Sequence, residues 1–279
     1  MDIKIIYEDK DLLVVDKPAG IIVFPEGPEG VRPGSDPGLT PKPTLIDLLV
    51  KKHPELADLG DPPRYGIVHR LDKNTSGILL VAKNPEALIF FQKQFSLPAK
   101  ALQNRATAGA VASSYAEATA DKKALADKKN SPTLEKSVEK RYIALVNGNV
   151  KEDTGSIHTL IGRSPMDMRK QKAYPLTEVG PGKREAITEY KVLQRYKEFT
   201  LLEVGIKTGR RHQIRCHLSY LQHPIAGDKL YSFKNSKAPE GLTRQFLHAK
   251  YLKIQLPGGE EKEFKSDLPE ELANVLKIL

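Results

Sequence analysis

Long apolar segments and cysteines are both scarce in this 279-residue sequence. About 18 uninterrupted apolar residues would be needed for a membrane-spanning helix, and no such run occurs. Residues 1–16 carry acidic side chains within their short apolar runs, which excludes a secretory signal peptide. The single cysteine, Cys216, excludes an internal disulfide framework and is typical of a reducing compartment. We therefore expect a soluble, cytoplasmic protein.

Several common functional signatures are also missing. The glycines between positions 27 and 38 match neither a P-loop nor a dinucleotide-binding fingerprint, because no Gly-Lys-Ser/Thr ending follows them. No set of Ser, His and acidic residues indicates acyl transfer, and no internal repeat is visible. His212 and Cys216 have the spacing of a helical ligand pair, but no second pair completes the three protein ligands that zinc needs. We expect no metal and no other cofactor.

Positive charge is in clear excess. The 44 Lys and Arg residues outnumber the 35 Asp and Glu residues, giving a formal net charge of +9. Such a balance favours polyanionic partners, although a merely soluble basic protein would share it. Nucleic acid is favoured over a membrane surface because no basic amphipathic helix with aromatic anchors is present.

Short β-type runs outnumber helical patterns along the chain. We expect an α+β fold with a central, mainly antiparallel sheet and flanking helices. Helical spacing covers residues 44–52, with Thr44 as N-cap, and residues 87–95, 210–221 and a closing segment after Pro269. Strands are expected at residues 3–7, 12–15, 66–68, 78–82, 141–146, 157–161, 186–193, 199–206, 246–256 and 263–265.

One internal tract departs from this pattern. Residues 97–136 are rich in Ala, Lys, Ser and Asp and hold few large apolar side chains. Such a tract buries too little surface to offset the entropy of ordering it. We expect it to be a low-complexity, mobile insertion within a single domain of residues 1–279, and the Gly/Pro-rich residues 25–43 to form a loop.

An acidic residue with basic neighbours stands between two expected strands. Residues 65–84 read Y-G-I-V-H-R-L-D-K-N-T-S-G-I-L-L-V-A-K-N, which presents Asp72 on a short polar connection. A tight turn would use the same Asp, Asn, Ser and Gly residues. A turn alone does not need Arg70 before the acid or Lys73 after it, so an ionised, accessible carboxylate is the functional alternative.

Two further segments hold candidate functional residues. In a helix over residues 210–221, Arg211 and Arg215 would lie one turn apart on one face, and the helix start would favour phosphate. A solvated basic helix face is the alternative reading. In the strand at 141–146, alternation places Tyr142 on a face where its ring could stack on a nucleobase, although a core tyrosine is the commoner outcome.

Taken together and in order, these segments resemble the RluA-type family of RNA pseudouridine synthases. The matching pieces are residues 12–20, 69–77, 140–146, 208–217, 223–231 and 247–249. The resemblance implies that Asp72 is the catalytic aspartate, that Tyr142 packs against the uracil and that Arg215 pairs with the aspartate. It implies an isomerase that converts uridine to pseudouridine in structured ribosomal or transfer RNA, on a single catalytic domain.

The remaining predicted site residues are expected to bind the substrate. Arg70 matches a residue that helps to hold the RNA open around a flipped nucleotide. The predicted substrate-binding set is His69, Arg70, Thr75, Arg210, Arg211, His212 and Gln213. We expect a monomer that needs no membrane.

The sequence departs from the family pattern in two places. The tract 97–136 replaces a short basic linker, and the sequence lacks the N-terminal accessory RNA-binding domain that many relatives carry. Two other functions stay open at this point. One is a non-catalytic protein that binds structured RNA on the same scaffold, and the other is a glycosidase in which water reacts at C1′.

Overall fold

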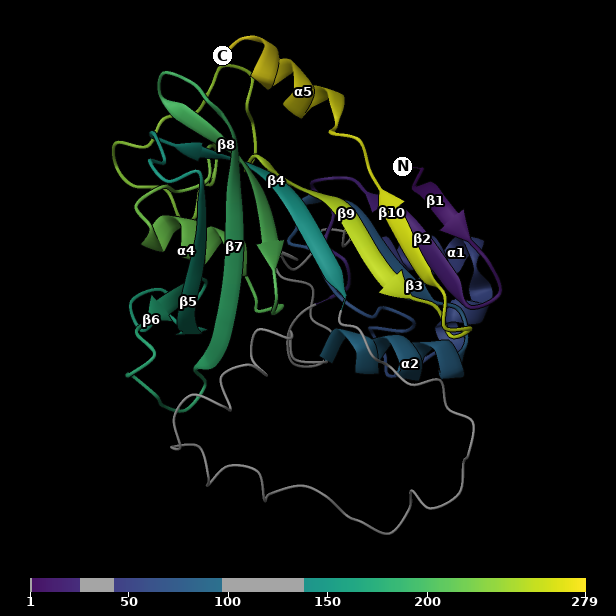
Figure 1. The fold of residues 1–279 in the computed structure, drawn as a ribbon. Coiled ribbons are helices and arrows are strands. Elements are labelled where there is room, and N and C mark those ends of the chain that lie inside the picture. The colour runs from purple at the N-terminus through teal and green to yellow at the C-terminus, as the bar shows by residue number, and fades with distance from the viewer. Residues whose placement is uncertain (1, 26–42, 97–137) are drawn as a thin grey trace, which may run out of the picture.

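The computed structural model describes residues 2–25, 43–96 and 138–279 (Figure 1). The predicted insertion at 97–136 and most of the predicted loop at 25–43 lie outside these ranges.

A ten-stranded sheet runs through the described residues. Its strand order is β1-β2-β3-β9-β4-β8-β7-β5-β6, and β10 pairs with β9. Every pairing is antiparallel except that of β3 with β9. The predicted α+β class with a mainly antiparallel sheet is therefore confirmed. The strands are β1 (Lys4–Glu8), β2 (Leu12–Lys17), β3 (Ser76–Ala82), β4 (Glu139–Asn147), β5 (Thr154–Arg163), β6 (Gln171–Tyr174), β7 (Arg184–Arg195), β8 (Phe199–Ile206), β9 (Leu247–Gln255) and β10 (Glu261–Lys265).

Short helices flank this sheet. They are α1 (Leu45–Lys52), the 3-10 helix η2 (Pro54–Asp58), α2 (Pro85–Ser96), α4 (Gln213–Tyr220) and α5 (Glu270–Lys277). Thr44 caps α1 as predicted: its hydroxyl accepts from the Asp47 amide, and the Asp47 carboxylate accepts from the Thr44 amide. In Figure 1, α2 lies beside β3, whereas α4 lies against the part of the sheet formed by β5 to β8. Within the described ranges, no helix is long and apolar enough to span a membrane.

Strand β3 is buried on both of its faces. Leu79 and Val81 belong to the large core that also contains α1, whereas Ile78 and Leu80 pack in a second core with Phe91 of α2. Alternation along the strand sends successive side chains to opposite sides, so each core receives every second residue. The start of β3 is thereby fixed from both sides of the sheet.

Two predicted elements differ from the structure. Residues 66–68 form only one bridge, between Ile67 and Val81, because the side chain of His69 rather than a strand backbone accepts the Leu80 amide. The helix predicted from residue 210 begins only at Gln213, since His212 has a left-handed backbone with φ of 53°. Arg211 therefore precedes the helix and does not share a helical face with Arg215. Strand β6 and helix η2 have no counterpart in the prediction.

Gly77 occupies the point where β3 meets β9. Its φ is +113°, and an added Cβ would lie 2.3 Å from the Ala249 carbonyl oxygen. Only glycine tolerates both the backbone angle and this close approach.

We expect Gly77→Ala to lower the free energy of unfolding by about 3 kcal/mol or more, because steric overlap adds to backbone strain. Gly258→Ala is the matched control, since an added Cβ there has open space and φ is not positive. Denaturant titrations of both variants measure the difference. Equal stabilities would contradict the steric role of Gly77.

Candidate active site

Asp72 lies in the loop that leads directly into β3, beside the parallel junction of β3 with β9. The Thr75 amide donates to the Asp72 carbonyl at 3.0 Å, which closes a tight turn. Ser76 and Gly77 then pair with His248 and Ala249 of β9. The acidic side chain is therefore presented from a turn whose end is fixed in the middle of the sheet.

A buried lysine from β2 holds the first half of this turn. Lys17 is 0% exposed, and its ammonium donates to the carbonyls of Pro18, Ile21 and Lys73 at 2.8, 2.9 and 3.1 Å. The Lys73 carbonyl also accepts from the Gly20 amide at 2.8 Å. Burial lowers the pKa of Lys17 to about 7, while the charge of Asp72 opposes that effect. The residue after Asp72 is thus tied to the turn that follows β2.

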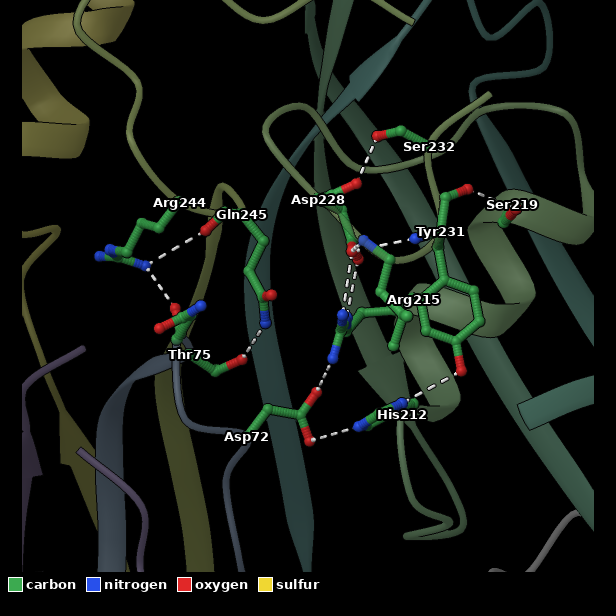
Figure 2. Close-up of polar contacts among 12 residues, drawn as sticks. Asp72, Thr75, His212, Arg215, Ser219, Asp228, Tyr231, Ser232, Arg244 and Gln245 are labelled. Atoms are coloured by element: carbon green, nitrogen blue, oxygen red, sulfur yellow. Dashed lines mark hydrogen bonds and ion pairs between the residues drawn. The ribbon is translucent and has the colours of Figure 1, made fainter. Parts of the chain in front are cut away.

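Two side chains that precede β9 hold the second half. Arg244 donates to the Asn74 carbonyl and to the Ser76 hydroxyl, each at 3.0 Å. The amide of Gln245 donates to the Thr75 hydroxyl at 2.9 Å, as Figure 2 shows. These donors come from about 170 residues away in sequence, and they fix the turn from the other side.

Arg215 connects Asp72 to a second, more deeply buried carboxylate. Its Nε and Nη2 atoms donate to the two oxygens of Asp228 at 2.7 and 2.9 Å, and its Nη1 donates to Asp72 at 2.9 Å (Figure 2). Asp228 also accepts from the backbone amides of Leu230 and Tyr231. A bidentate pair is directional, so Asp228 sets the position from which the guanidinium meets Asp72.

His212 completes the polar contacts around Asp72. Its Nε2 atom lies 3.9 Å from the carboxylate, and its Nδ1 is 3.1 Å from the Tyr231 hydroxyl. The left-handed backbone at His212 is costly for a residue with a Cβ, and such conformations concentrate at functional sites. Here it turns the imidazole toward Asp72 immediately before α4 begins.

The net pKa of Asp72 lies below its ordinary value. Burial alone would raise it, but the charges of a protonated His212 and of Arg215 lower it by more. Burial lowers the pKa of His212 to about 4, so the imidazole is neutral at pH 7. At neutral pH, Arg215 is consequently the cation in contact with Asp72 that keeps it ionised.

Asp72 and Tyr142 line one cleft of about 300 Å³. Tyr142 comes from β4 and is buried, and both burial and the charge of Asp72 raise the pKa of its phenol. The phenol therefore keeps its proton at neutral pH. A carboxylate, a protonated phenol and a fixed guanidinium, supplied by three separate segments, converge on the same space.

Arg70 and His69 both line this cleft but make different contacts. The Arg70 guanidinium lies 5.8 Å from the centre of the Phe24 ring. His69 accepts the Leu80 amide at 3.1 Å, and its ring stacks on Phe95 with 4.7 Å between centres. Burial lowers the pKa of His69 to about 3, so it is a neutral wall of the cleft.

Other predicted substrate-binding residues line the cleft as well. Gln213 is buried, and its amide makes four hydrogen bonds that tie the start of α4 to β7 and to Thr208. Thr75 is likewise buried and bonded to Gln245. Arg210 donates to the Glu185 carbonyl. The structure thus gives Gln213 and Thr75 positioning contacts, whereas Arg210 and Arg211 keep donors beside the cleft.

The two residues considered as a metal pair have other surroundings. Cys216 is buried, and burial raises its pKa to about 12. Among the residues that the structure describes, no three His, Cys, Asp or Glu side chains are grouped closely enough to hold a metal ion.

Several positioning residues were not in the predicted set. Asp228 and Tyr231 lie in residues 223–231 and Lys17 lies in residues 12–20, and both segments were selected only by the family resemblance. Arg244 and Gln245 carried no signal, because their role depends on a long-range contact with the turn at Asp72. His248 is an interior histidine, bonded to Ser76 and to the Ser266 carbonyl.

Comparisons with known proteins agree on one family. A family model described as RNA pseudouridylate synthase matches residues 11–108 and 105–220. An "uncharacterized RNA pseudouridine synthase" of Aquifex aeolicus is 36% identical and aligns with 99% of this chain and 73% of its own length. A "ribosomal large subunit pseudouridine synthase D" of Nitrosomonas europaea is 34% identical over 99% of this chain and 65% of its own length.

A solved structure shares the fold. The structure titled "Human RNA Pseudouridylate Synthase Domain Containing 1" has a TM-score of 0.60 and 24% sequence identity, and the match covers 96% of this chain and 84% of that one.

We expect Arg215→Met to lower the free energy of unfolding by about 3–5 kcal/mol at pH 7, because two carboxylates would lose their buried counter-ion. Arg141→Met is the matched control. Arg141 is 45% exposed and pairs with surface glutamates, so its loss should cost less than about 1 kcal/mol. Equal costs in urea titrations would refute the buried network.

Proposed function

This chain belongs to the RNA pseudouridylate synthase family of isomerases, and from that premise we propose that Asp72 is the carboxylate that acts on the ribose of a target uridine. The observation that carries the proposal is the contact between Asp72 and Arg215 at the cleft, with Arg215 itself held by Asp228. This arrangement keeps an acid ionised at a place that is largely screened from water.

The isomerisation suits such a site. The N1–C1′ bond of uridine breaks, the uracil rotates, and C5 then joins C1′ while the C5 proton leaves and N1 takes up a proton. The starting and final nucleotides have the same atoms, so no redox partner or group donor enters. An ionised carboxylate beside C1′ can act as nucleophile or can take a sugar proton to begin elimination, and both routes need Asp72 charged.

Tyr142 is the proposed platform for the detached base. Stacking of a base on an aromatic ring contributes about 1–3 kcal/mol, enough to hold a free uracil in place while it turns. The raised pKa of the phenol supports a stacking and hydrogen-bonding role rather than that of a phenolate base.

The target nucleotide must leave the RNA stack to reach Asp72. Extrusion costs a few kcal/mol, and contacts with the displaced strand offset it. Arg70 stands at the cleft, where it can occupy the space that the nucleotide vacates. Arg210 and Arg211 stand at the same cleft as donors for phosphate.

Large-subunit ribosomal RNA is the proposed substrate, on the strength of the relatives named for that subunit. Transfer RNA is the alternative. A cytoplasmic location, motivated by the single cysteine of the sequence, and a monomeric state complete the proposal.

We expect Asp72→Asn to lower pseudouridine formation by about 10⁴-fold or more, a typical loss when a nucleophile is removed. RNA binding should be retained, because the amide has nearly the same shape. Tritium release from ribosomal and transfer RNA labelled at C5 of uridine measures the reaction, and filter binding measures affinity. Asp58→Asn on exposed η2 is the control and should keep full activity.

Undiminished tritium release by Asp72→Asn would rule out this aspartate. Binding of RNA by the wild type without any pseudouridine would instead favour the non-catalytic reading. Free uracil as the product would favour a glycosidase.

A further inference from the structure

Lys140 is a partly buried lysine without an acidic partner among the residues that the structure describes. Its ammonium lies 5.3 Å from the centre of the Phe95 ring and makes no hydrogen bond or ion pair with any described residue. Burial, together with the charge of Arg210, lowers its pKa to about 8. Keeping a charged amine in such surroundings lowers the stability of the fold. We therefore expect the charge of Lys140 to interact with a ligand rather than to stabilise the described part of the chain.

The surroundings of Lys140 add positive charge rather than balancing it. The charge of Arg210 acts on Lys140, and Arg210 itself is subject to the charge of Arg184, which Glu185 opposes. The Nε atom of Arg211 is buried and has no hydrogen-bond partner among the described residues. Buried donors are nearly always bonded, so a donor without an acceptor points to one supplied by a ligand.

The described lining of the cleft also holds more cationic than anionic side chains. Asp72 is the single carboxylate among its described lining residues, and Arg215 already contacts it. The cations that line the cleft are Arg64, Arg70, Lys140, Arg210, Arg211 and Arg215. The described lining of the cleft therefore suits an anionic ligand.

We propose that Lys140, together with Arg210 and Arg211, forms a subsite for one phosphodiester group of the RNA beside the target uridine. Lys140 stands two residues before Tyr142 in β4, and both line the cleft. A nucleotide stacked on Tyr142 would thus have its flanking phosphate within reach of the ammonium. This inference rests on the proposed function for the identity of the nucleotide, but the subsite itself requires only RNA.

The salt dependence of binding tests this subsite. Each phosphate contact contributes about 0.7 to 0.9 to the slope of log affinity against log salt. We expect Lys140→Gln to weaken binding of an in vitro transcript of large-subunit ribosomal RNA by about 10-fold at low salt and to reduce that slope by about one contact. Lys140→Arg should restore most of both.

Lys4→Gln is the matched control. It removes the same charge from an exposed position of the edge strand β1, and it should leave affinity and slope nearly unchanged. The melting temperature supplies a second readout. Lys140→Gln should melt at the wild-type temperature or above it, because it removes a desolvated charge without a protein partner.

Three results for Lys140→Gln would overturn the subsite. The first is an unchanged slope and affinity. The second is a weaker affinity with an unchanged slope, which indicates a contact with the base, and the third is a loss of affinity that accompanies a lowered melting temperature. Failure of the proposed function looks different. In that case the wild type forms no pseudouridine, yet Lys140→Gln still reduces the salt slope of RNA binding.

Discussion

The ion chain from Asp228 through Arg215 to Asp72 is the interaction on which the site depends. A guanidinium between two carboxylates is stable in a largely buried place only if all of its partners are held at hydrogen-bonding positions. Asp228 fixes the guanidinium of Arg215 through a bidentate contact, and backbone amides fix Asp228 itself. Arg215 maintains the charge of Asp72, which is the property that the proposed chemistry needs. The position of Arg215 is in turn set by Asp228, which does not contact Asp72.

The fold serves the same end by fixing the turn that carries Asp72. Lys17 reaches this turn from β2, and Arg244 and Gln245 reach it from the segment before β9. Antiparallel pairing of β2 with β3 brings Lys17 to the turn, and parallel pairing of β3 with β9 brings Arg244 and Gln245 to it. The side chain of Asp72 therefore has a fixed orientation although it lies on a turn and not on a helix or strand.

Local pattern was enough to predict much of the sheet and to select Asp72 as the candidate acid. Short, continuous apolar runs indicated β2 and β3, and the basic neighbours of Asp72 indicated that its segment is more than a turn. The partner of Asp72 is 143 residues away, so only the family resemblance could suggest Arg215. The residue type at position 212 does not indicate a left-handed backbone. This backbone makes α4 begin at Gln213 rather than at the predicted residue 210. The role of Asp228 depended on a tertiary contact that no local spacing encodes.

The direct test of this account is the ionisation of Asp72 itself, followed by carbon-13 NMR of the carboxyl group and assigned with Asp72→Asn. In the wild type the group should titrate below the ordinary aspartate value of about 3.9. In Arg215→Gln its pKa should rise, because burial is then opposed only by the charges of His212 and Arg70, without the charge and hydrogen bond of Arg215. A wild-type pKa above the ordinary value, or the same pKa in both proteins, would contradict the central role of Arg215.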